Sequence, residues 1–292
     1  GYNASFLDSV YKESGANVLD REQVLQKADI LVSVSTILEN SDLGILKNKA
    51  IIIGGFNPYE NGDKIKKIIG KNLSLISLDF LPRISRAQSM DILSSQANLA
   101  GYKAVIEASS IFKKALPMMM TAAGTIIPAK CLILGAGVAG LQAIATAKRL
   151  GCVVSAFDVR QEVEEQVNSL GAKFVKVEDG ENTKETQTVY AKEMSEDYKK
   201  KQLRAIHDVA INMDIIISTA LIPGKKAPLL IESKTISQMK SGSILIDLAS
   251  SSGGNIEGSK IGEKVNINDC VVYAPRNLPS LIAYDASLLF SK

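Results

Sequence analysis

Histidine and cysteine, which commonly supply acid–base, nucleophilic and zinc-binding groups, are scarce in this sequence. Its 292 residues include one histidine, His207, and three cysteines, Cys131, Cys152 and Cys270. The cysteines lie far apart and form no Cys-x-x-Cys pair, so the sequence has neither a disulfide framework nor a zinc motif. We expect three buried thiols in a reducing compartment. His207 lies in the charged segment DYKKKQLRAIHDV, where we expect a surface position.

Long apolar runs and blocks of one charge are also missing. The uncharged stretch CLILGAGVAGLQAIATA falls short of the roughly 20 residues that span a membrane. The 34 basic and 31 acidic residues are well mixed, and no basic block is longer than Lys199–Lys201, which argues against a nucleic-acid-binding protein. The first residues, GYNASFLDSV, lack the basic start and apolar core of a signal peptide. They also lack an initiating methionine, so we expect a piece of a longer polypeptide.

Short apolar runs alternate with amphipathic segments along the first eighty residues. The runs DILVSVS, KAIIIGG and LSLISLDF predict strands, whereas YKESGANVLDREQVLQKAD and ENGDKIKKIIGKN have apolar residues at helical spacing. Strands and helices in this order predict βαβ units and a parallel sheet.

A second α/β unit follows a long helical segment. Residues 84–116 contain no proline, and Gly101 is their one glycine, so we predict a single connecting helix that ends at PMMMTAAGTIIPAK. The last sixteen residues predict a helix that returns toward the first domain. Further strands are predicted in CLILGAG, VVSAFDV, KFVKV, DIIISTA, SILIDLA and CVVYAP.

These patterns predict an α/β protein of two Rossmann-like, doubly wound domains joined by a long helix, with a cofactor in the cleft between them. We place the first domain at residues 1–92 plus 278–292, and the second, nucleotide-binding domain at residues 93–277. At 292 residues the chain is long enough for two such domains.

The stretch LILGAGVAGLQAIATAKRLG predicts a strand, a tight turn and a helix in the order of a dinucleotide-binding unit. Gly135 permits the turn, Gly137 allows the backbone to approach a pyrophosphate, and Gly140 lets the helix pack closely on the strand. The phosphates are then expected at the positive N-terminus of the helix.

An acidic residue at the end of the next strand selects the nucleotide. Asp158 ends VVSAFDV, 18 residues after Gly140, where a carboxylate accepts hydrogen bonds from an adenosine ribose and repels a 2′-phosphate. This favours NAD(H) over NADP(H). Arg160 is able to receive a 2′-phosphate, but we expect it to pair with a glutamate of QEVEEQ or to contact the adenine. FAD fits less well, because FAD folds usually place these glycines near the start of a chain.

Two loops after later strands are further candidates. In DIIISTALIPGKKAP, a turn at Pro223–Gly224 leaves Ala220 and Leu221 at the sheet edge, where an adenine or ribose has room, although an ordinary loop fits the pattern equally well. The polar stretch 181–202 is long for an insertion in a compact domain. By composition it predicts a solvated loop.

The stretch PRISRAQSMDILS places polar side chains directly after an apolar run. Gln88, Asp91 and Ser94 are three residues apart, which places them along one face of the first turns of the connecting helix. A solvated helix end and a ligand-facing stripe both fit this pattern.

The chain resembles the NAD(H)-binding domain of proton-translocating NAD(P) transhydrogenase, the soluble alpha-subunit domain in the alanine dehydrogenase/transhydrogenase superfamily. The similarity covers nearly the whole chain. The first of the stretches below is specific, because alanine dehydrogenases share the two-domain architecture but not that stretch. The stretches that carry the resemblance are PRISRAQSMDILSSQANLAGYKAV, PMMMTAAGTIIPAK, LGAGVAGLQAIATAKRLGCVVSAFDVR, YAKEMSEDYKKKQ, TALIPGKKAP and APRNLPSLIAYDASLLF.

The resemblance implies roles for particular residues. Gln88 and Asp91 position the nicotinamide without acting as acid or base, Val138 falls in the glycine turn, and Tyr190 matches the tyrosine of a mobile loop that closes over bound nucleotide. No metal site is implied. The expected cofactor contacts are Arg83, Ile84, Ser85, Gln88, Asp91, Ser94, Gly135, Gly137, Val138, Ala139, Gly140, Asp158, Val159, Arg160, Tyr190, Ala220 and Leu221.

The implied reaction is hydride transfer from NADH to NADP⁺ on a partner domain, coupled to proton translocation. The implied partners are an NADP(H)-binding domain, a membrane-embedded proton-channel domain and a second copy of the chain. The location would be one face of an energy-transducing membrane, in a bacterial cytoplasm or an organelle matrix. The family's first strand is absent from this chain, so we expect no activity without the partner.

Two other functions stay open. An amino-acid dehydrogenase of the alanine dehydrogenase type needs a lysine and a histidine at the substrate carbonyl, and His207 is the only histidine. A non-catalytic NAD-binding module has less need of residues that orient the nicotinamide.

Overall fold

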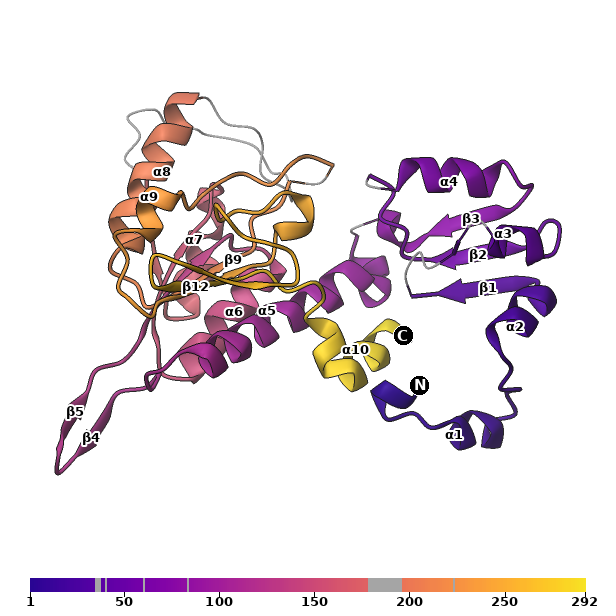
Figure 1. Ribbon diagram of the computed structural model, residues 1–292, viewed down its shortest axis with the longest axis horizontal. Helices are drawn as coiled ribbons and strands as arrows, with labels where there is room; N and C mark the ends of the chain where they lie inside the picture. The colour runs from indigo at the N-terminus through magenta and orange to yellow at the C-terminus, as the bar shows by residue number, and fades with distance from the viewer. Residues whose placement is uncertain (35–37, 40, 60, 83, 178–195, 223) are drawn as a thin grey trace. The chain divides into compact units, whose positions relative to one another are not determined.

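The computed structural model describes residues 1–292 except 35–37, 40, 60, 83, 178–195 and 223 (Figure 1). Contacts within the chain divide it into two compact units. Unit 1 contains Gly1–Gln96 and Ile282–Lys292, and unit 2 contains Ala97–Leu281. The domain boundaries expected from the sequence, at residues 93 and 277, remain a prediction.

Unit 1 contains a parallel sheet in the order β1-β2-β3, as the alternating pattern predicted. The strands are β1 (Ile30–Ser33), β2 (Ile51–Gly54) and β3 (Ser74–Ser77). Helix α2 (Arg21–Lys27) begins where the side chain of Asp20 accepts a hydrogen bond from the Gln23 N–H (2.8 Å), the usual N-cap geometry. The core consists of Leu25, Leu43, Leu46, Ala50, Ile52, Phe56, Ile68 and Leu73.

The two ends of the chain meet within unit 1. Helix α10 (Ala283–Phe290) forms the predicted C-terminal helix, and its Tyr284 ring stacks on Phe6 with centroids 5.2 Å apart. The remaining helices of unit 1 are η1 (Tyr2–Ala4), α1 (Asp8–Glu13), α3 (Asp42–Ile45), α4 (Gly62–Ile69), η2 (Leu78–Phe80) and η3 (Ser85–Met90).

The connecting helix is shorter than predicted. Helix α5 covers Ile92–Ile111 instead of 84–116. Asp91 has an extended ψ of 90°, and its carboxylate accepts hydrogen bonds from the Ser94 N–H (3.0 Å) and hydroxyl (2.7 Å). Asp91 therefore starts α5 as its N-cap, and Gln88 belongs to the separate 3₁₀ helix η3.

Unit 2 contains a seven-stranded sheet in the order β11-β12-β10-β9-β6-β7-β8. Six strands are parallel and match the predicted runs, whereas β11 is antiparallel to β12. The strand order reverses next to β6, as in doubly wound sheets. The strands are β6 (Lys130–Leu134), β7 (Val153–Phe157), β8 (Lys173–Phe174), β9 (Ile215–Ser218), β10 (Ile244–Asp247), β11 (Lys264–Ile267) and β12 (Cys270–Tyr273).

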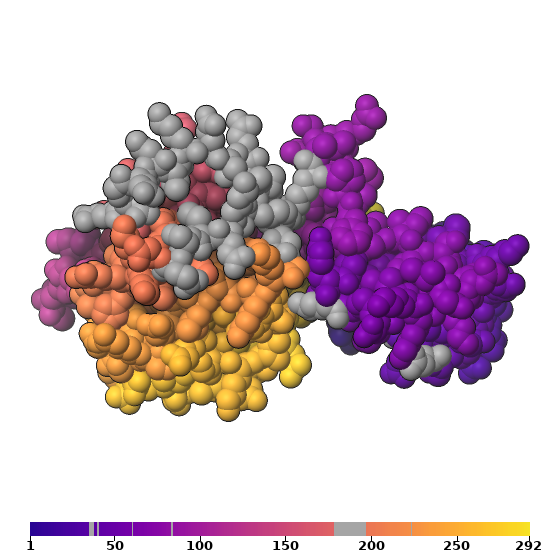
Figure 2. All heavy atoms as spheres, turned by 90° about the horizontal axis from the view of Figure 1, so that it is seen from above, coloured from indigo at the N-terminus to yellow at the C-terminus, as the bar shows by residue number. Residues whose placement is uncertain are grey.

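Helices cover both faces of this sheet. Alternate side chains of the strands pack with α5, α6 (Val138–Arg149) and α7 (Glu164–Ser169) on one face. The other face packs with α8 (Glu196–Ala210) and α9 (Ser233–Ile236). The segments of unit 2 that follow α8, drawn in orange, form a continuous surface in Figure 2. The short 3₁₀ helices of unit 2 are η4 (Gln161–Val163) and η5 (Ser250–Ser252), and η6 (Pro279–Ile282) ends at the unit boundary.

Two elements were not predicted from the sequence. Strand β11 is one. The other is the antiparallel hairpin of β4 (Met119–Thr121) and β5 (Gly124–Ile126), in a stretch that we had expected only to break the long helix. The hairpin projects from the body of unit 2 (Figure 1). Its three-residue strands bury no side chain, so the apolar periodicity that reveals core strands is absent.

The scarce residues occupy interior positions. All three cysteines are free and buried, as expected. His207 was expected on the surface, but it is half-buried on α8 with Nδ1 2.9 Å from the Thr235 hydroxyl of α9. Within the portion of the chain that the structure describes, no helix combines the length and apolar character needed to cross a bilayer.

Candidate functional site

The reversal of strand order brings the carboxyl ends of β6 and β9 next to each other. Leu134, at the end of β6, is paired with Ser218, at the end of β9. Beyond these residues the chain continues into the glycine turn on one side and into Thr219 on the other. Doubly wound sheets bind ligands in the crevice at this kind of switch point.

The three glycines of the turn have different surroundings. Gly135 has a φ of +94°, and a Cβ there would lie 2.7 Å from Thr219 Oγ1. A Cβ on Gly140 would overlap the Gly135 carbonyl oxygen, whereas a Cβ on Gly137 would meet no atom within 4 Å. Gly135 and Gly140 are therefore required by the fold itself. Gly137 faces open space, where a ligand has room to approach the backbone.

Helix α6 begins at this open side. Its N-cap is Gly137, which has no side chain to bond the first N–H groups of the helix. Val138 is exposed and Ala139 is half-buried. An uncapped first turn presents N–H donors and the positive end of the helix dipole, an arrangement that favours an anion.

Asp158 links the second strand to the glycine turn. Its buried carboxylate accepts a hydrogen bond from the Ala136 N–H (2.7 Å). Arg160 binds both carboxylate oxygens, with Nε to Oδ1 and Nη2 to Oδ2 each at 3.0 Å. The hydrogen bond with Asp158 raises the pKa of the Arg160 guanidinium above its ordinary value.

This arrangement differs from the one expected for Arg160. We had predicted a glutamate partner or an adenine contact, but the arginine forks onto Asp158 two residues away. The sequence reasoning missed this pair because it treated Asp158 as reserved for a ribose. A ribose diol that binds Asp158 must replace hydrogen bonds from Arg160, since guanidinium and backbone donors already contact both oxygens.

The end of β9 is held from two directions. Thr219 Oγ1 donates to the Gly135 carbonyl oxygen (3.1 Å), and the side chain of Asn255 binds both the N–H (3.1 Å) and the C=O (2.9 Å) of Ala220. Leu221 follows as an exposed apolar side chain. Ala220 and Leu221 therefore lie on the same switch-point edge as the glycine turn.

Asn255 and Asp247 are polar residues of this edge that the sequence reasoning did not select. Both are fully buried, and the Asn255 N–H donates to Asp247 Oδ2 (3.0 Å). The sequence signal was an aspartate at the end of the apolar run SILID, followed by the Gly-Gly-Asn of SSSGGN.

The predicted nicotinamide residues belong to unit 1. Asp91 and Ser94 are bonded to each other at the start of α5, and Gln88 is exposed on η3. Ile84 and Ser85 are exposed at the start of η3, and Val159, in unit 2, is half-buried. Arg83 and Tyr190 lie outside the described residues, as does Pro223 of the predicted turn.

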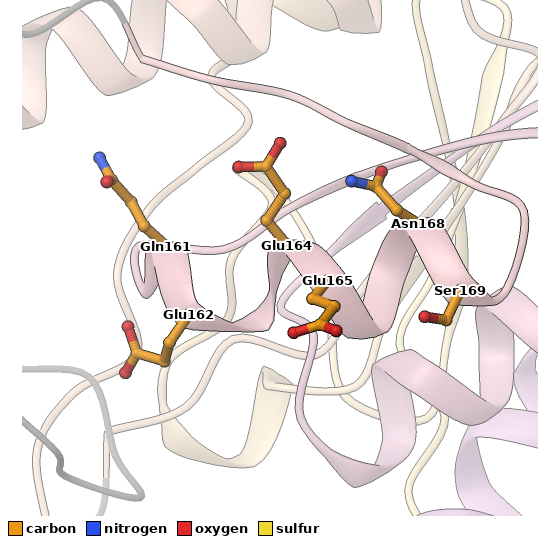
Figure 3. Close-up of a pocket in the computed structure, with 6 residues that line it drawn as sticks. All are labelled: Gln161, Glu162, Glu164, Glu165, Asn168 and Ser169. Carbon is orange, nitrogen blue, oxygen red and sulfur yellow. The ribbon is translucent and has the colours of Figure 1, made fainter.

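A shallow hollow next to Arg160 has the wrong charge for a nucleotide phosphate. It is lined by η4 and α7, where Gln161, Glu164 and Asn168 point to one side and Glu162, Glu165 and Ser169 to the other (Figure 3). Three carboxylates repel an anion. In the described ranges, no cluster of three or more histidine, cysteine, aspartate or glutamate side chains is arranged to hold a metal ion.

The buried thiols are poor nucleophiles. Burial raises the pKa of Cys152 to about 11 and that of Cys131 well above its ordinary value. The reactive thiolate form is therefore rare at neutral pH. This region of unit 2 offers no cysteine chemistry.

Comparisons with known proteins agree with this site. Residues 1–100 match the family described as alanine dehydrogenase/PNT, N-terminal domain, and residues 104–292 match its C-terminal domain. The first of the separate chains that make up the NAD(P) transhydrogenase alpha subunit of Rickettsia prowazekii is 47% identical over 296 residues, covering 100% of this chain and 77% of that one.

A solved structure and a more distant relative complete the comparison. The crystal structure of transhydrogenase from Sinorhizobium meliloti superposes with a TM-score of 0.86 at 41% identity, covering 99% of this chain and 78% of that one. Alanine dehydrogenase 2 of Staphylococcus aureus is only 25% identical over 300 residues, covering 99% of this chain and 73% of that enzyme. The chain therefore belongs to the alanine dehydrogenase/PNT family, and within it groups with the transhydrogenase alpha subunits.

Proposed function

We propose that the chain is the NAD(H)-binding component of a proton-translocating NAD(P) transhydrogenase. It would donate hydride from NADH to NADP⁺ held by a partner domain. The observation that carries this proposal is the switch-point edge of unit 2, where Gly137 faces open space and Asp158 ends the next strand. The identity to transhydrogenase alpha subunits supports the same reaction.

The residues present fit a dinucleotide. The open side of Gly137 and the uncapped start of α6 suit a pyrophosphate. The carboxylate of Asp158 suits a ribose diol and opposes a 2′-phosphate. Val138, Ala139, Val159, Arg160, Ala220 and Leu221 complete the proposed adenosine and phosphate contacts.

We assign the nicotinamide end to Gln88, Asp91 and Ser94, with Arg83, Ile84, Ser85 and Tyr190 as further contacts. A bound dihydronicotinamide supplies the hydride, and its transfer to a second nicotinamide requires alignment rather than an acid or base. The side chains of this chain therefore need only bind, orient and exclude water. The bond between Asp91 and Ser94 supports this role, because it fixes both side chains in advance.

The relatives from Rickettsia prowazekii and Rhodospirillum rubrum are named as one portion of an alpha subunit, which indicates that those enzymes contain further chains. For this chain we propose an NADP(H)-binding domain and a membrane-embedded proton-channel domain as partners, at the face of an energy-transducing membrane. We also propose a homodimer. The β4–β5 hairpin supports it, since Met120 and the adjoining Ile127 are each 79% exposed and exposed apolar patches mark interaction surfaces.

Titration of the purified chain with NADH and NADPH tests the proposed cofactor. We expect NADH to bind at least about tenfold more tightly, because a carboxylate at the ribose disfavours a 2′-phosphate. Equal affinity would contradict the role of Asp158. An alanine dehydrogenase would instead oxidise NADH with pyruvate and ammonia, a reaction that we expect this chain not to catalyse.

A further inference from the structure

Asn255 is a fully buried side chain in which both amide atoms are used. Its Oδ1 accepts hydrogen bonds from the Ser218 hydroxyl (2.6 Å) and the Ala220 N–H (3.1 Å). Its Nδ2 donates to the carbonyl oxygens of Ala220 (2.9 Å) and Pro228 (2.7 Å). The amide thus binds the main chain of Ala220 on both its polar groups, as a neighbouring strand would.

Asp247 holds Asn255 in place through its main chain. This fully buried carboxylate accepts hydrogen bonds from the N–H groups of Asn255 (3.0 Å) and Ile256 (3.2 Å) and from the Ser259 hydroxyl (2.8 Å). A Cβ on Gly254 would lie 2.8 Å from Asp247 Oδ2. The Gly-Gly-Asn sequence is therefore what allows the loop to close over the carboxylate.

The network reaches the proposed nucleotide site through the end of β9. Ala220 follows Thr219, whose hydroxyl bonds the glycine turn at Gly135. Asn255 and Thr219 together fix this segment relative to the turn, and the next residue is the exposed Leu221. A buried amide that only filled space would not need to bind both polar groups of one residue at the sheet edge.

We propose that Asn255 is a positioning residue, which holds Ala220 and Leu221 as one wall of the adenosine end of the nucleotide site. The proposal rests on the function proposed above. It assigns Asn255 no contact with the nucleotide, because its amide is already saturated by protein groups.

The test compares two variants of the full chain with wild type. Asn255→Ala removes the hold on Ala220, whereas the control Ser259→Ala removes one hydrogen bond from the opposite side of Asp247 and leaves Ala220 untouched. Dissociation constants for NADH and for 5′-AMP are measured by titration, and the thermal unfolding of each variant is recorded. If Asn255→Ala does not fold, Ser218→Ala replaces it, because that variant removes the 2.6 Å bond to Asn255 Oδ1.

We expect Asn255→Ala to weaken NADH and 5′-AMP by the same factor, about tenfold, the scale of a buried polar group left unpaired. Ser218→Ala should weaken both by about threefold, as one neutral hydrogen bond predicts. Ser259→Ala should lower the unfolding temperature and change neither constant. A purely structural role would lower stability in all variants without weakening either ligand, and this result would overturn the proposal.

Two other outcomes are also decisive. If Asn255→Ala weakens NADH but not 5′-AMP, the residue does not act at the adenosine end, and the proposal is wrong. If the wild-type chain binds no NADH, the proposed function fails and this inference fails with it. Wild-type binding together with unchanged variants would overturn the inference alone.

Discussion

At the scale of single residues, Asp158 has two tasks that compete for the same oxygens. It braces the glycine turn through the Ala136 N–H, and it is bound by Arg160. Nucleotide binding at this carboxylate is thus an exchange of hydrogen bonds, in which ribose hydroxyls replace guanidinium donors. The exchange keeps the carboxylate hydrogen-bonded in both states, which avoids the cost of a buried, unpaired charge.

Replacing Asp158 with alanine should weaken NADH binding by about 1–3 kcal/mol, because a charge-assisted bond to the ribose and the brace on the turn are both lost. Fluorescence titration measures the change. Glu164→Gln is the matched control, since Glu164 lies on the following helix and pairs with Lys176 (2.8 Å). Undiminished affinity in Asp158→Ala would show that another group binds the ribose.

A second acidic residue, Asp42, makes the stability of unit 1 depend on pH. The hydrogen bond from Arg21 (2.6 Å) and the Glu39 N–H lower the pKa of Asp42 below its ordinary value. A lowered pKa in the folded chain means that the ionised carboxylate stabilises the fold at pH values above about 3.9, the ordinary aspartate pKa. This contribution is lost as the pH falls through the lowered pKa.

Asp42→Asn should therefore lower the denaturant midpoint of the chain at pH 7, and the difference from wild type should shrink toward pH 3. Urea denaturation followed by circular dichroism at the two pH values measures it. Asp63→Asn is the control, because the pair of Asp63 with Lys66 is almost fully exposed and contributes little. A difference that grows on acidification would contradict the assignment.

At the scale of elements, the strand–turn–helix unit from β6 to α6 separates glycines of the fold from a glycine of the site. Gly140 lets α6 lie directly on the turn, because any Cβ there would overlap the Gly135 carbonyl oxygen. Gly137 has a φ of −80° and an empty surrounding. Alanine therefore fits at Gly137 in the ligand-free fold.

These surroundings predict opposite outcomes for two conservative variants. Gly140→Ala should destabilise the chain by about 1–3 kcal/mol or more, since overpacking forces the helix off the strand. Gly137→Ala should unfold at the wild-type temperature but weaken NADH, because the added methyl group lies where the backbone approaches the pyrophosphate. Thermal unfolding with and without NADH distinguishes the two. Wild-type NADH affinity in Gly137→Ala would mean that the phosphates bind elsewhere.

Local sequence signals predicted most elements because these elements obey simple periodicities. Buried parallel strands such as β9 and β10 are continuous apolar runs, and the glycine turn has fixed spacing. The β4–β5 hairpin has no buried side that a periodic pattern could reveal. The start of α5 was misplaced because Asp91 acts as a cap, and an aspartate inside a helical pattern does not distinguish a cap from a helical residue.

At the scale of the whole molecule, the site could be predicted only in part. Residues adjacent in sequence to the glycine turn were found, whereas Asn255 and Asp247 were not. Their role depends on contacts across 35 residues and more, such as the bond between Asn255 and Ala220. The partner of Arg160 was missed for a related reason, since hydrogen-bond competition is decided by geometry and not by spacing.

Our main proposal is that this chain delivers hydride from NADH to a nicotinamide nucleotide on another protein domain. The decisive measurement is the rate at which an NADP⁺ analogue is reduced by NADH, with the chain alone and after addition of the NADP(H)-binding component of a transhydrogenase. We expect no reduction by the chain alone and rapid reduction by the mixture. NADH oxidation by the chain alone with pyruvate and ammonia, or no reduction by a mixture in which NADH is bound, would contradict the proposal.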